Sequence, residues 1–346
     1  MENLRLESVW RDGLISKNWS ERAANQFIYH LAQSTISQYN RYIANYSAFC
    51  HLQGLESVSN VDSVVADYLC SLCDSSDRPK SILTANVAAL NKYFSAVNMS
   101  RVGENIHVFV QALTKSGTKS PMLKTPVMPI DAFFSLFNDW PNNEGLSIKD
   151  LRLKSVCLLA LVAMARPSDL APKAGLFDHD TFEFSKVVLS TNQIEFSGVD
   201  MKLIFHGIKN DYQRDGFELT IPRMTAQDIK VDPVHALECY IKRTESFRAG
   251  VTNSPLFVTL VKPYKALEAS SISRILNEAI DRAGLGSKGF TAKCFRPTGA
   301  TNAINFGLSP DMARYVGRWR CASTFEKHYV HTQLPKDYCE KMLKNN

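Results

Sequence analysis

Apolar residues recur at steps of three and four over residues 34–54, STISQYNRYIANYSAFCHLQG. The repeated positions are Ile36, Tyr39, Ile43, Tyr46 and Phe49. This spacing places side chains on one face of an α-helix, so the segment predicts an amphipathic helix with one buried stripe. Ser34 directly precedes the stripe and is the expected N-cap.

Three further segments have helical patterns and complete a predicted helical domain over residues 1–113. They are VDSVVADYLCSLC, SILTANVAALNKYFSAV and a shorter one around ENIHVFVQALTKS. A helical bundle that only binds a partner fits this pattern as well as a part of an enzyme does. The next segment, residues 114–129, is rich in Lys, Ser, Thr and Pro without an apolar period, and predicts a basic linker. Such a linker either follows a phosphate backbone or is a solvated connector.

Beyond residue 130 the pattern becomes mixed. DAFFSLFNDW predicts a helix capped by Asp131, and IKDLRLKSVCLLALVAMA is a helix apolar enough for a core, ending at Arg166-Pro167. QIEFSGVDMKLIFHGIK and FELTIPR predict strands around the polar turn NDYQRDG. After PLFVTL, helical patterns return in SSISRILNEAIDRAGL, FTAKCFRPTGATNAINFG, LSPDMARYVG and STFEKHYVH. The predicted fold class is mainly α with a small antiparallel β-sheet (α+β), with a second domain over residues 130–346.

Composition supports two folded domains and places the positive charge in the second. The chain has 346 residues, of which 45% are hydrophobic, enough for a substantial core. The formal net charge is +6, yet residues 1–113 carry 9 Lys and Arg against 10 Asp and Glu. The excess therefore lies in the second part and fits a polyanionic partner, or an ordinary soluble surface. No apolar run of 18 residues and no signal-peptide pattern occur, so we expect a soluble intracellular protein.

Cysteine and histidine positions give no expectation of a metal or cofactor. The 8 cysteines are spread along the chain and are expected to be reduced thiols. Cys70 and Cys73 form a C-x-x-C in an apolar helix without a second ligand pair, and are expected to be buried helix residues. His328 and His331, with Cys339 nearby, lack a fourth ligand. A glycine-rich phosphate loop and a convincing carboxylate cluster are also missing, which argues against nucleotide use and two-metal nuclease chemistry.

Two arginines of the second part are candidates for phosphate binding. Phosphoryl transfer on DNA without a metal needs cationic donors around the phosphate, a proton donor for the leaving oxygen, and a nucleophile. Arg166 ends a predicted buried helix, and Arg296 lies near the start of another. Two guanidinium groups so placed can grip the non-bridging oxygens of one phosphate.

Four segments resemble the motifs of tyrosine recombinases of the phage-integrase type. LLALVAMARPSDL resembles the family's first-arginine motif, particularly that of eukaryotic Crypton and DIRS-like transposon enzymes, in which Arg-Pro-Ser-Asp is common. GIKNDYQRDGFELTIPR resembles the hairpin that carries the family's lysine. KCFRPTGATNAINFGLS resembles the second-arginine box, and VGRWRCASTFEKHYVH the closing box with the tyrosine. The four occur in the family's order across residues 150–332, and the helices of residues 1–113 resemble, less specifically, its core-binding domain.

The resemblance implies a role for each matched residue. Arg166 and Arg296 would hold the scissile phosphate, and Lys209 would protonate the departing 5′-oxygen. Tyr329 would attack phosphorus and form a 3′-phosphotyrosine. Asp169 would orient Arg166, and Trp319 would take the family's His/Trp position.

The sequence departs from the family pattern at two positions. Lys293 stands where the family usually has His, and a lysine is a poor proton acceptor near pH 7 because its free pKa is about 10.4. The gap from Trp319 to Tyr329 is slightly long, which leaves Arg318 or His328 as substitutes at the His/Trp position. Tyr338 is the next candidate nucleophile, outside the matched box.

The resemblance implies a DNA integrase that acts without a cofactor. Its two domains would close around duplex DNA, and strand exchange would proceed through a homotetramer and a Holliday junction. The mobile-element relatives imply a transposable element as substrate and a nuclear location. A type IB topoisomerase with the same chemistry and a domesticated, inactive DNA-binding protein remain as alternatives.

Overall fold

The computed structural model divides the chain into two compact units, residues 1–122 and 123–346. It describes residues 5–28, 31, 33–55, 58–74, 80–97, 99–116, 125–178, 183–187, 189–206, 216–249 and 254–329. Half of the residues expected to form the linker over 114–129, namely 117–124, lie outside these ranges. None of the described helices is long and apolar enough to cross a membrane.

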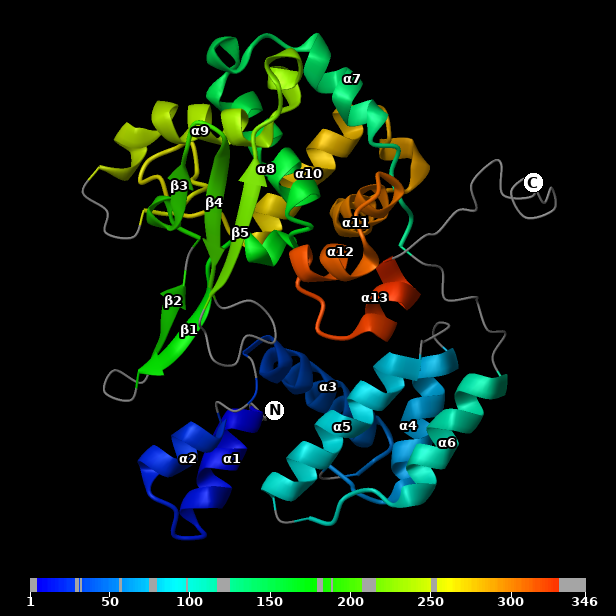
Figure 1. Ribbon diagram of the computed structural model, residues 1–346. Coiled ribbons are helices and arrows are strands. Elements are labelled where there is room, and N and C mark those ends of the chain that lie inside the picture. Colours follow the sequence, from blue (N-terminus) through cyan, green and yellow to red (C-terminus); the bar gives the residue numbers. More distant parts are fainter. Residues whose placement is uncertain are drawn as a thin grey trace, which may run out of the picture. The chain divides into compact units, whose positions relative to one another are not determined.

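The first unit is helical, and the apolar periods of the sequence predicted four of its helices, those within residues 33–116. Its helices are α1 (Leu6–Ile15), α2 (Glu21–Ile28), α3 (Gln33–Leu52), α4 (Asp62–Asp74), α5 (Lys80–Ala96) and α6 (Glu104–Ser116) (Figure 1). The stripe of α3 is buried as expected: the Tyr46 ring centroid lies 5.0 Å from that of Tyr68 and 6.4 Å from that of Phe94. Ser34 lies inside α3 and is therefore not its N-cap, which corrects the prediction.

The second unit is built around α8 (Ile148–Val162), which is buried from Leu151 to Leu161 except at Arg152. The Ser147 hydroxyl caps this helix by accepting a hydrogen bond from the Asp150 N–H. Figure 1 shows α8 in the middle of the unit, in contact with α9 (Pro233–Arg243), α10 (Ala269–Arg282) and α11 (Phe295–Asn305). A helix that is apolar all round requires such cover on every side.

The small antiparallel sheet has the order β3-β4-β5, with β3 at Ile194–Phe196, β4 at Asp200–Phe205 and β5 at Phe217–Pro222. Leu203 of β4 faces Ile194 on one side and Leu219 on the other. These are the strands that the sequence predicted, and the fold class is confirmed. A separate hairpin of β1 (Lys173–Asp178) and β2 (Glu183–Val187) was not predicted.

Short helices complete the second unit: α7 (Asp131–Asp139), α12 (Pro310–Val316) and α13 (Ala322–Tyr329). Asp131 is the first residue of α7 and forms no side-chain cap, so that prediction was wrong. Ser323 and Glu326 have the spacing of a capping box, but α13 already begins at Ala322, so Ser323 lies inside the helix and is not its N-cap. The cysteines in the described part of the chain are free thiols, and Cys70 and Cys73 lie on α4 as predicted but are only half-buried.

Candidate active site

Arg166 lies just after the C-terminal end of α8. The Met164 N–H donates to the Leu161 carbonyl and the Ala165 N–H to the Ala160 carbonyl, which is the paired bonding of a Schellman motif. Met164 takes the left-handed conformation this motif needs, with φ 46°. The helix therefore ends at Val162, earlier than the sequence indicated, and Arg166 follows the cap as the residue before the short turn Pro167–Asp169.

Arg318 and Trp319 follow the C-terminal end of α12, which also closes with a Schellman motif. The Arg318 N–H donates to the Tyr315 carbonyl and the Trp319 N–H to the Arg314 carbonyl. Arg318 itself is left-handed, with φ 60°, at a position where glycine is the usual residue. This conformation costs a non-glycine residue about 1–2 kcal/mol, so the Arg318 side chain must contribute something that glycine would not.

Arg296, at the start of α11, joins the two helix ends. Its Nη1 donates to the Met164 carbonyl and its Nη2 to the Gly317 carbonyl. Both acceptors lie at C-terminal helix ends, where unpaired carbonyls carry partial negative charge and favour cations. The guanidinium is thereby fixed in place, with the residue only 4% exposed.

Asp169 is the carboxylate of this region. One oxygen, Oδ2, accepts the Arg166 backbone N–H at 2.9 Å and lies 3.4 Å from Nη2 of Arg318. It also lies 3.9 Å from Nη1 of Arg166, while the other oxygen lies 3.3 Å from Nζ of Lys173. Asp169 thus ties the turn after α8 to the end of α12 across a long stretch of sequence.

Around Asp169, positively charged side chains outnumber negatively charged ones among the described residues. We call Arg166, Arg296 and Arg318 the arginine cluster. Burial, followed by the repulsion of the two other guanidiniums, lowers the pKa of Arg296 to about 9. Burial would raise the pKa of Asp169, but Lys173 and Arg318 outweigh it and the pKa is lowered. A second anion would relieve the repulsion within the cluster.

Tyr329 lies against this cluster within its own chain. The Arg296 guanidinium carbon is 3.9 Å from the Trp319 ring centroid and 5.6 Å from that of Tyr329. The two rings are tilted against each other with centroids 4.7 Å apart, and the Thr301 hydroxyl donates to the Tyr329 carbonyl at 3.1 Å. Tyr329 is the last residue of α13 that the structure describes.

Several buried N–H groups of the site have no hydrogen-bond acceptor among the described atoms. They are Nε of Arg296, Nε and Nη1 of Arg318, and Nε1 of Trp319. A buried unsatisfied donor costs about 1–3 kcal/mol, so a concentration of them favours a ligand rich in acceptor oxygens. A phosphate group combines such oxygens with the negative charge that the cluster needs.

The remaining expected site residues are Lys209, His328 and Lys293. Lys209 lies outside the described residues, as does the side chain of His328. Lys293 is exposed, and no hydrogen bond or ion pair joins it to the described part of the chain. The roles assigned to these three residues stay predictions.

Lys173, by contrast, was missed. Its side chain is 16% exposed, and its Nζ lies 3.3 Å from Asp169 Oδ1. Burial lowers its pKa, while Asp169 opposes that shift. Lys173 follows Asp169 by four residues, a spacing that indicates a side-chain contact only inside a helix. Because Asp169 lies in a turn and Lys173 in a strand, the spacing did not predict their contact.

Solved structures of DNA recombinases and integrases share the architecture of this chain. A XerH site-specific recombinase bound to difH substrate, in a pre-cleavage complex, aligns with a TM-score of 0.59 over 99% of this chain and 95% of its own, at 14% identity. The chain has the tyrosine recombinase fold. A Tn1549 transposon integrase in complex with a circular intermediate DNA gives a TM-score of 0.56 over 98% of both chains, at 13% identity.

A lambda integrase dimer bound to a COC′ core site, residues 75–356, gives a TM-score of 0.53 over 89% of this chain and 94% of its own, at 14% identity. No protein-family model and no curated protein sequence matches the chain. The likeness to tyrosine recombinases is thus one of fold, and the activity of this chain has to be argued from its own residues.

Proposed function

We propose that the protein is a site-specific DNA recombinase that cleaves and rejoins DNA through a 3′-phosphotyrosine on Tyr329. The observation that carries the proposal is the position of the Tyr329 ring, 5.6 Å from the Arg296 guanidinium carbon, beside a cluster of three arginines. A nucleophile next to phosphate-binding cations is what transesterification at phosphorus requires.

In the proposed reaction the phenolic oxygen of Tyr329 forms a bond to phosphorus as the bond from phosphorus to the 5′-oxygen breaks. The phenolic proton leaves to a base, which is either Lys293 or another group near Tyr329, and Lys209 supplies a proton to the 5′-oxygen. The arginine cluster stabilises the negative charge that gathers on the non-bridging oxygens, and one such donor contributes about 2.7–4 kcal/mol. Rejoining reverses these steps, so the phosphodiester energy is retained and no nucleotide cofactor is consumed.

The finer parts of the proposal rest on the sequence motifs. The Arg-Pro-Ser-Asp form of the first motif supports a Crypton or DIRS-like transposable element as the origin of the chain, with action in a nucleus. A homotetramer on DNA, with a Holliday junction as intermediate, would accompany this origin. Several structural neighbours are integrases or recombinases bound to DNA, which supports double-stranded DNA as the partner.

A pool of nicked DNA duplexes with randomised sequence around the nick tests the chemistry without knowledge of the site. Cleavage near a nick releases a short fragment and traps the protein on the DNA, and sequencing the trapped DNA then gives the site. We expect a covalent adduct with the wild type and with Tyr338→Phe, and none with Tyr329→Phe. An adduct that persists in Tyr329→Phe would move the nucleophile elsewhere.

The same preparation separates the alternatives. DNA binding without any adduct in the wild type would indicate an inactive DNA-binding protein. Relaxation of supercoiled plasmid by a monomer without sequence preference would indicate a type IB topoisomerase.

A further inference from the structure

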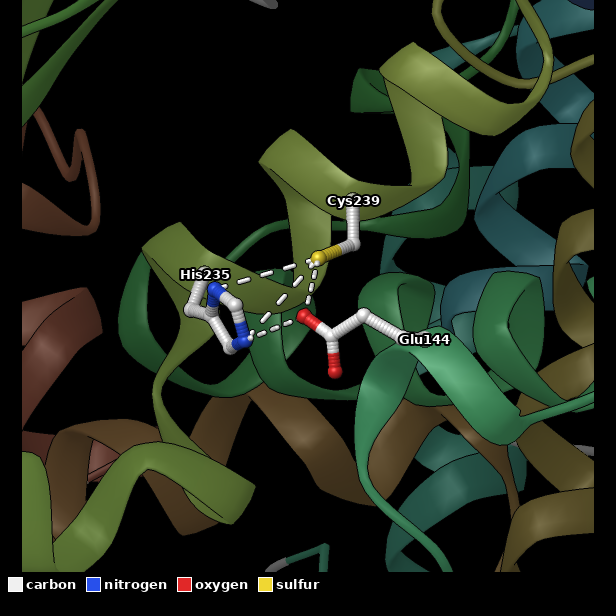
Figure 2. A group of neighbouring side chains, drawn as sticks. All are labelled: Glu144, His235 and Cys239. Carbon is white, nitrogen blue, oxygen red and sulfur yellow. Dashed lines mark hydrogen bonds and ion pairs between the residues drawn. The ribbon is translucent and has the colours of Figure 1, made fainter.

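A second cluster of reactive side chains lies on the opposite side of the second unit from α13. Glu144 belongs to the short turn Asn143–Gly145, and His235 and Cys239 belong to α9 (Figure 1). Their ligand atoms all lie within 4.8 Å of one another. Figure 2 shows the three side chains converging from the turn and the helix.

The distances between these atoms fit the corners of a zinc site. Glu144 Oε1 is 3.3 Å from His235 Nε2 and 3.5 Å from Cys239 Sγ, and Sγ is 3.9 Å from Nε2. Tetrahedral zinc with its usual bond lengths separates nitrogen and oxygen ligands by about 3.4 Å, and sulfur from either by about 3.6 Å. The observed separations agree within a few tenths of an ångström, so little rearrangement is needed.

The framework holds the three side chains in this arrangement. His235 and Cys239 are four residues apart on one face of α9, a helix that starts at Pro233 and is capped by the Asp232 side chain. The turn that carries Glu144 is anchored at Asn143, whose side chain accepts from Lys154 Nζ at 2.8 Å and whose carbonyl accepts from Arg243. Ligands on rigid, supported elements are what a preformed metal site needs.

We propose that Glu144, His235 and Cys239 bind one Zn²⁺ ion. A thiolate, an imidazole and a carboxylate form a ligand set that zinc accepts, and the thiolate and carboxylate together neutralise the dication. Three protein ligands leave the fourth tetrahedral position for water or for a group from a partner. Glu144 is exposed and His235 partly exposed, so that position is open to solvent.

The ion would join the turn before α8 to α9, two elements that flank the central helix. Cys239 and Glu144 are 95 residues apart in sequence, so this is a long-range crosslink. The proposed zinc site is separate from the arginine cluster and its proposed binding of phosphate. The zinc proposal does not depend on whether Tyr329 cleaves DNA. It also revises the expectation, drawn from sequence spacing alone, that the chain has no metal ligands.

Cobalt(II) is a suitable probe because a cobalt–thiolate bond absorbs in the near ultraviolet and reports coordination by sulfur directly. We expect the full chain, kept reduced and free of oxygen, to bind one equivalent of Co²⁺ with this absorption, and one equivalent of Zn²⁺ to remove it. Cys239→Ser should abolish the absorption, and Cys321→Ser, which changes an exposed cysteine outside the cluster, should leave it intact. The absence of absorption in the wild type, or its persistence in Cys239→Ser, would overturn the proposal.

Thermal unfolding provides a second measurement with a milder variant. Zinc at 100 times its dissociation constant should raise the ratio of folded to unfolded protein about 100-fold, and so raise the melting temperature. Glu144→Gln changes an exposed side chain and should fold, yet lose most of this increase. An equal zinc-dependent increase in Glu144→Gln and wild type would exclude Glu144 as a ligand.

Discussion

Replacement of Asp169 by asparagine should destabilise the second unit strongly. Asp169 is the carboxylate that faces Lys173 at 3.3 Å, Arg318 at 3.4 Å and Arg166 at 3.9 Å, and its side chain is 3% exposed. Asp169→Asn keeps the shape and an acceptor for the Arg166 N–H, but leaves buried cations without their counter-charge. Loss of one partner of a buried ion pair costs about 3–5 kcal/mol.

The lower end of this range is the better figure for Asp169. A third of the Arg166 side chain is exposed, so water screens its share of the interaction, and the retained acceptor spares one hydrogen bond. We therefore expect a loss of about 3 kcal/mol, or about a hundredfold in the folding equilibrium. With a urea slope of about 3 kcal/mol per molar, the midpoint would fall by about 1 M.

Urea unfolding of wild type, Asp169→Asn and Asp311→Asn measures this effect. Asp311 pairs with Arg314 at 3.1 Å on the surface and is 88% exposed, so its replacement should change little. The first unit contains neither change, so its transition is an internal reference. An unchanged midpoint for Asp169→Asn would refute the idea that Asp169 compensates the arginine cluster.

The pH dependence gives an independent check on the same residue. The pKa of Asp169 is lower in the folded protein than its ordinary value, which is about 3.9 in an unfolded chain. Its contribution to the free energy of unfolding is then fully present above that ordinary value and is lost as the pH falls through the folded-state pKa. The stability difference between wild type and Asp169→Asn should therefore be flat from about pH 5 to 8 and shrink in acid.

Further predictions concern the site and the packing behind it. Arg296→Lys replaces the two nitrogens that donate to the helix-end carbonyls by one, and should slow adduct formation by about 10²–10³-fold in a single-turnover assay, with DNA affinity in gel shifts nearly unchanged. Lys209→Ala should slow cleavage in the same way; a large loss of affinity with normal cleavage would make it a backbone contact. Gly299→Ala places a Cβ 2.3 Å from the Leu161 carbonyl and should cost about 1–3 kcal/mol in urea unfolding, whereas Gly198→Ala meets open space and should cost little. The logarithm of DNA affinity should fall by about 0.9 per phosphate neutralised for each tenfold rise in salt.

The fold could be predicted where local pattern decides structure. Three predictions were confirmed: the apolar run of α8, the alternation in β4 and β5, and the apolar period of α3. In each of them the residues that become buried can be recognised from neighbouring positions in the sequence. The prediction missed α1, α2 and α9, whose apolar positions are diluted by polar residues. In the structure α1 packs on α5 and α9 packs on α8, and both partners are distant in sequence.

The candidate site was predictable only one residue at a time. Local motifs point to Arg166, Arg296 and Tyr329, but the contact of Asp169 with Arg318 spans 149 residues and has no local signature. The left-handed conformation of Arg318 was equally hidden, because left-handed helix caps are usually recognised by a glycine. Sequence motifs therefore identify the candidate residues one by one. The ion pair between Asp169 and Arg318 follows only from the way the ends of α8 and α12 pack together.

The position of Arg296 couples the proposed nucleophile, Tyr329, to the proposed phosphate-binding groups. Its guanidinium holds the Gly317 carbonyl, and a Cβ at Gly317 would lie 1.7 Å from the Trp319 ring, so that ring rests directly on the end of α12. Trp319 in turn packs on Tyr329 and on Phe325, which tie α13 to the same point. A movement of α13 that carries Tyr329 toward phosphorus must slide its rings over a guanidinium that the two helix ends keep fixed. In the proposed reaction the Arg296 guanidinium, held at two helix ends, would be the fixed part of the site, and a movement that brings Tyr329 to phosphorus would come from α13.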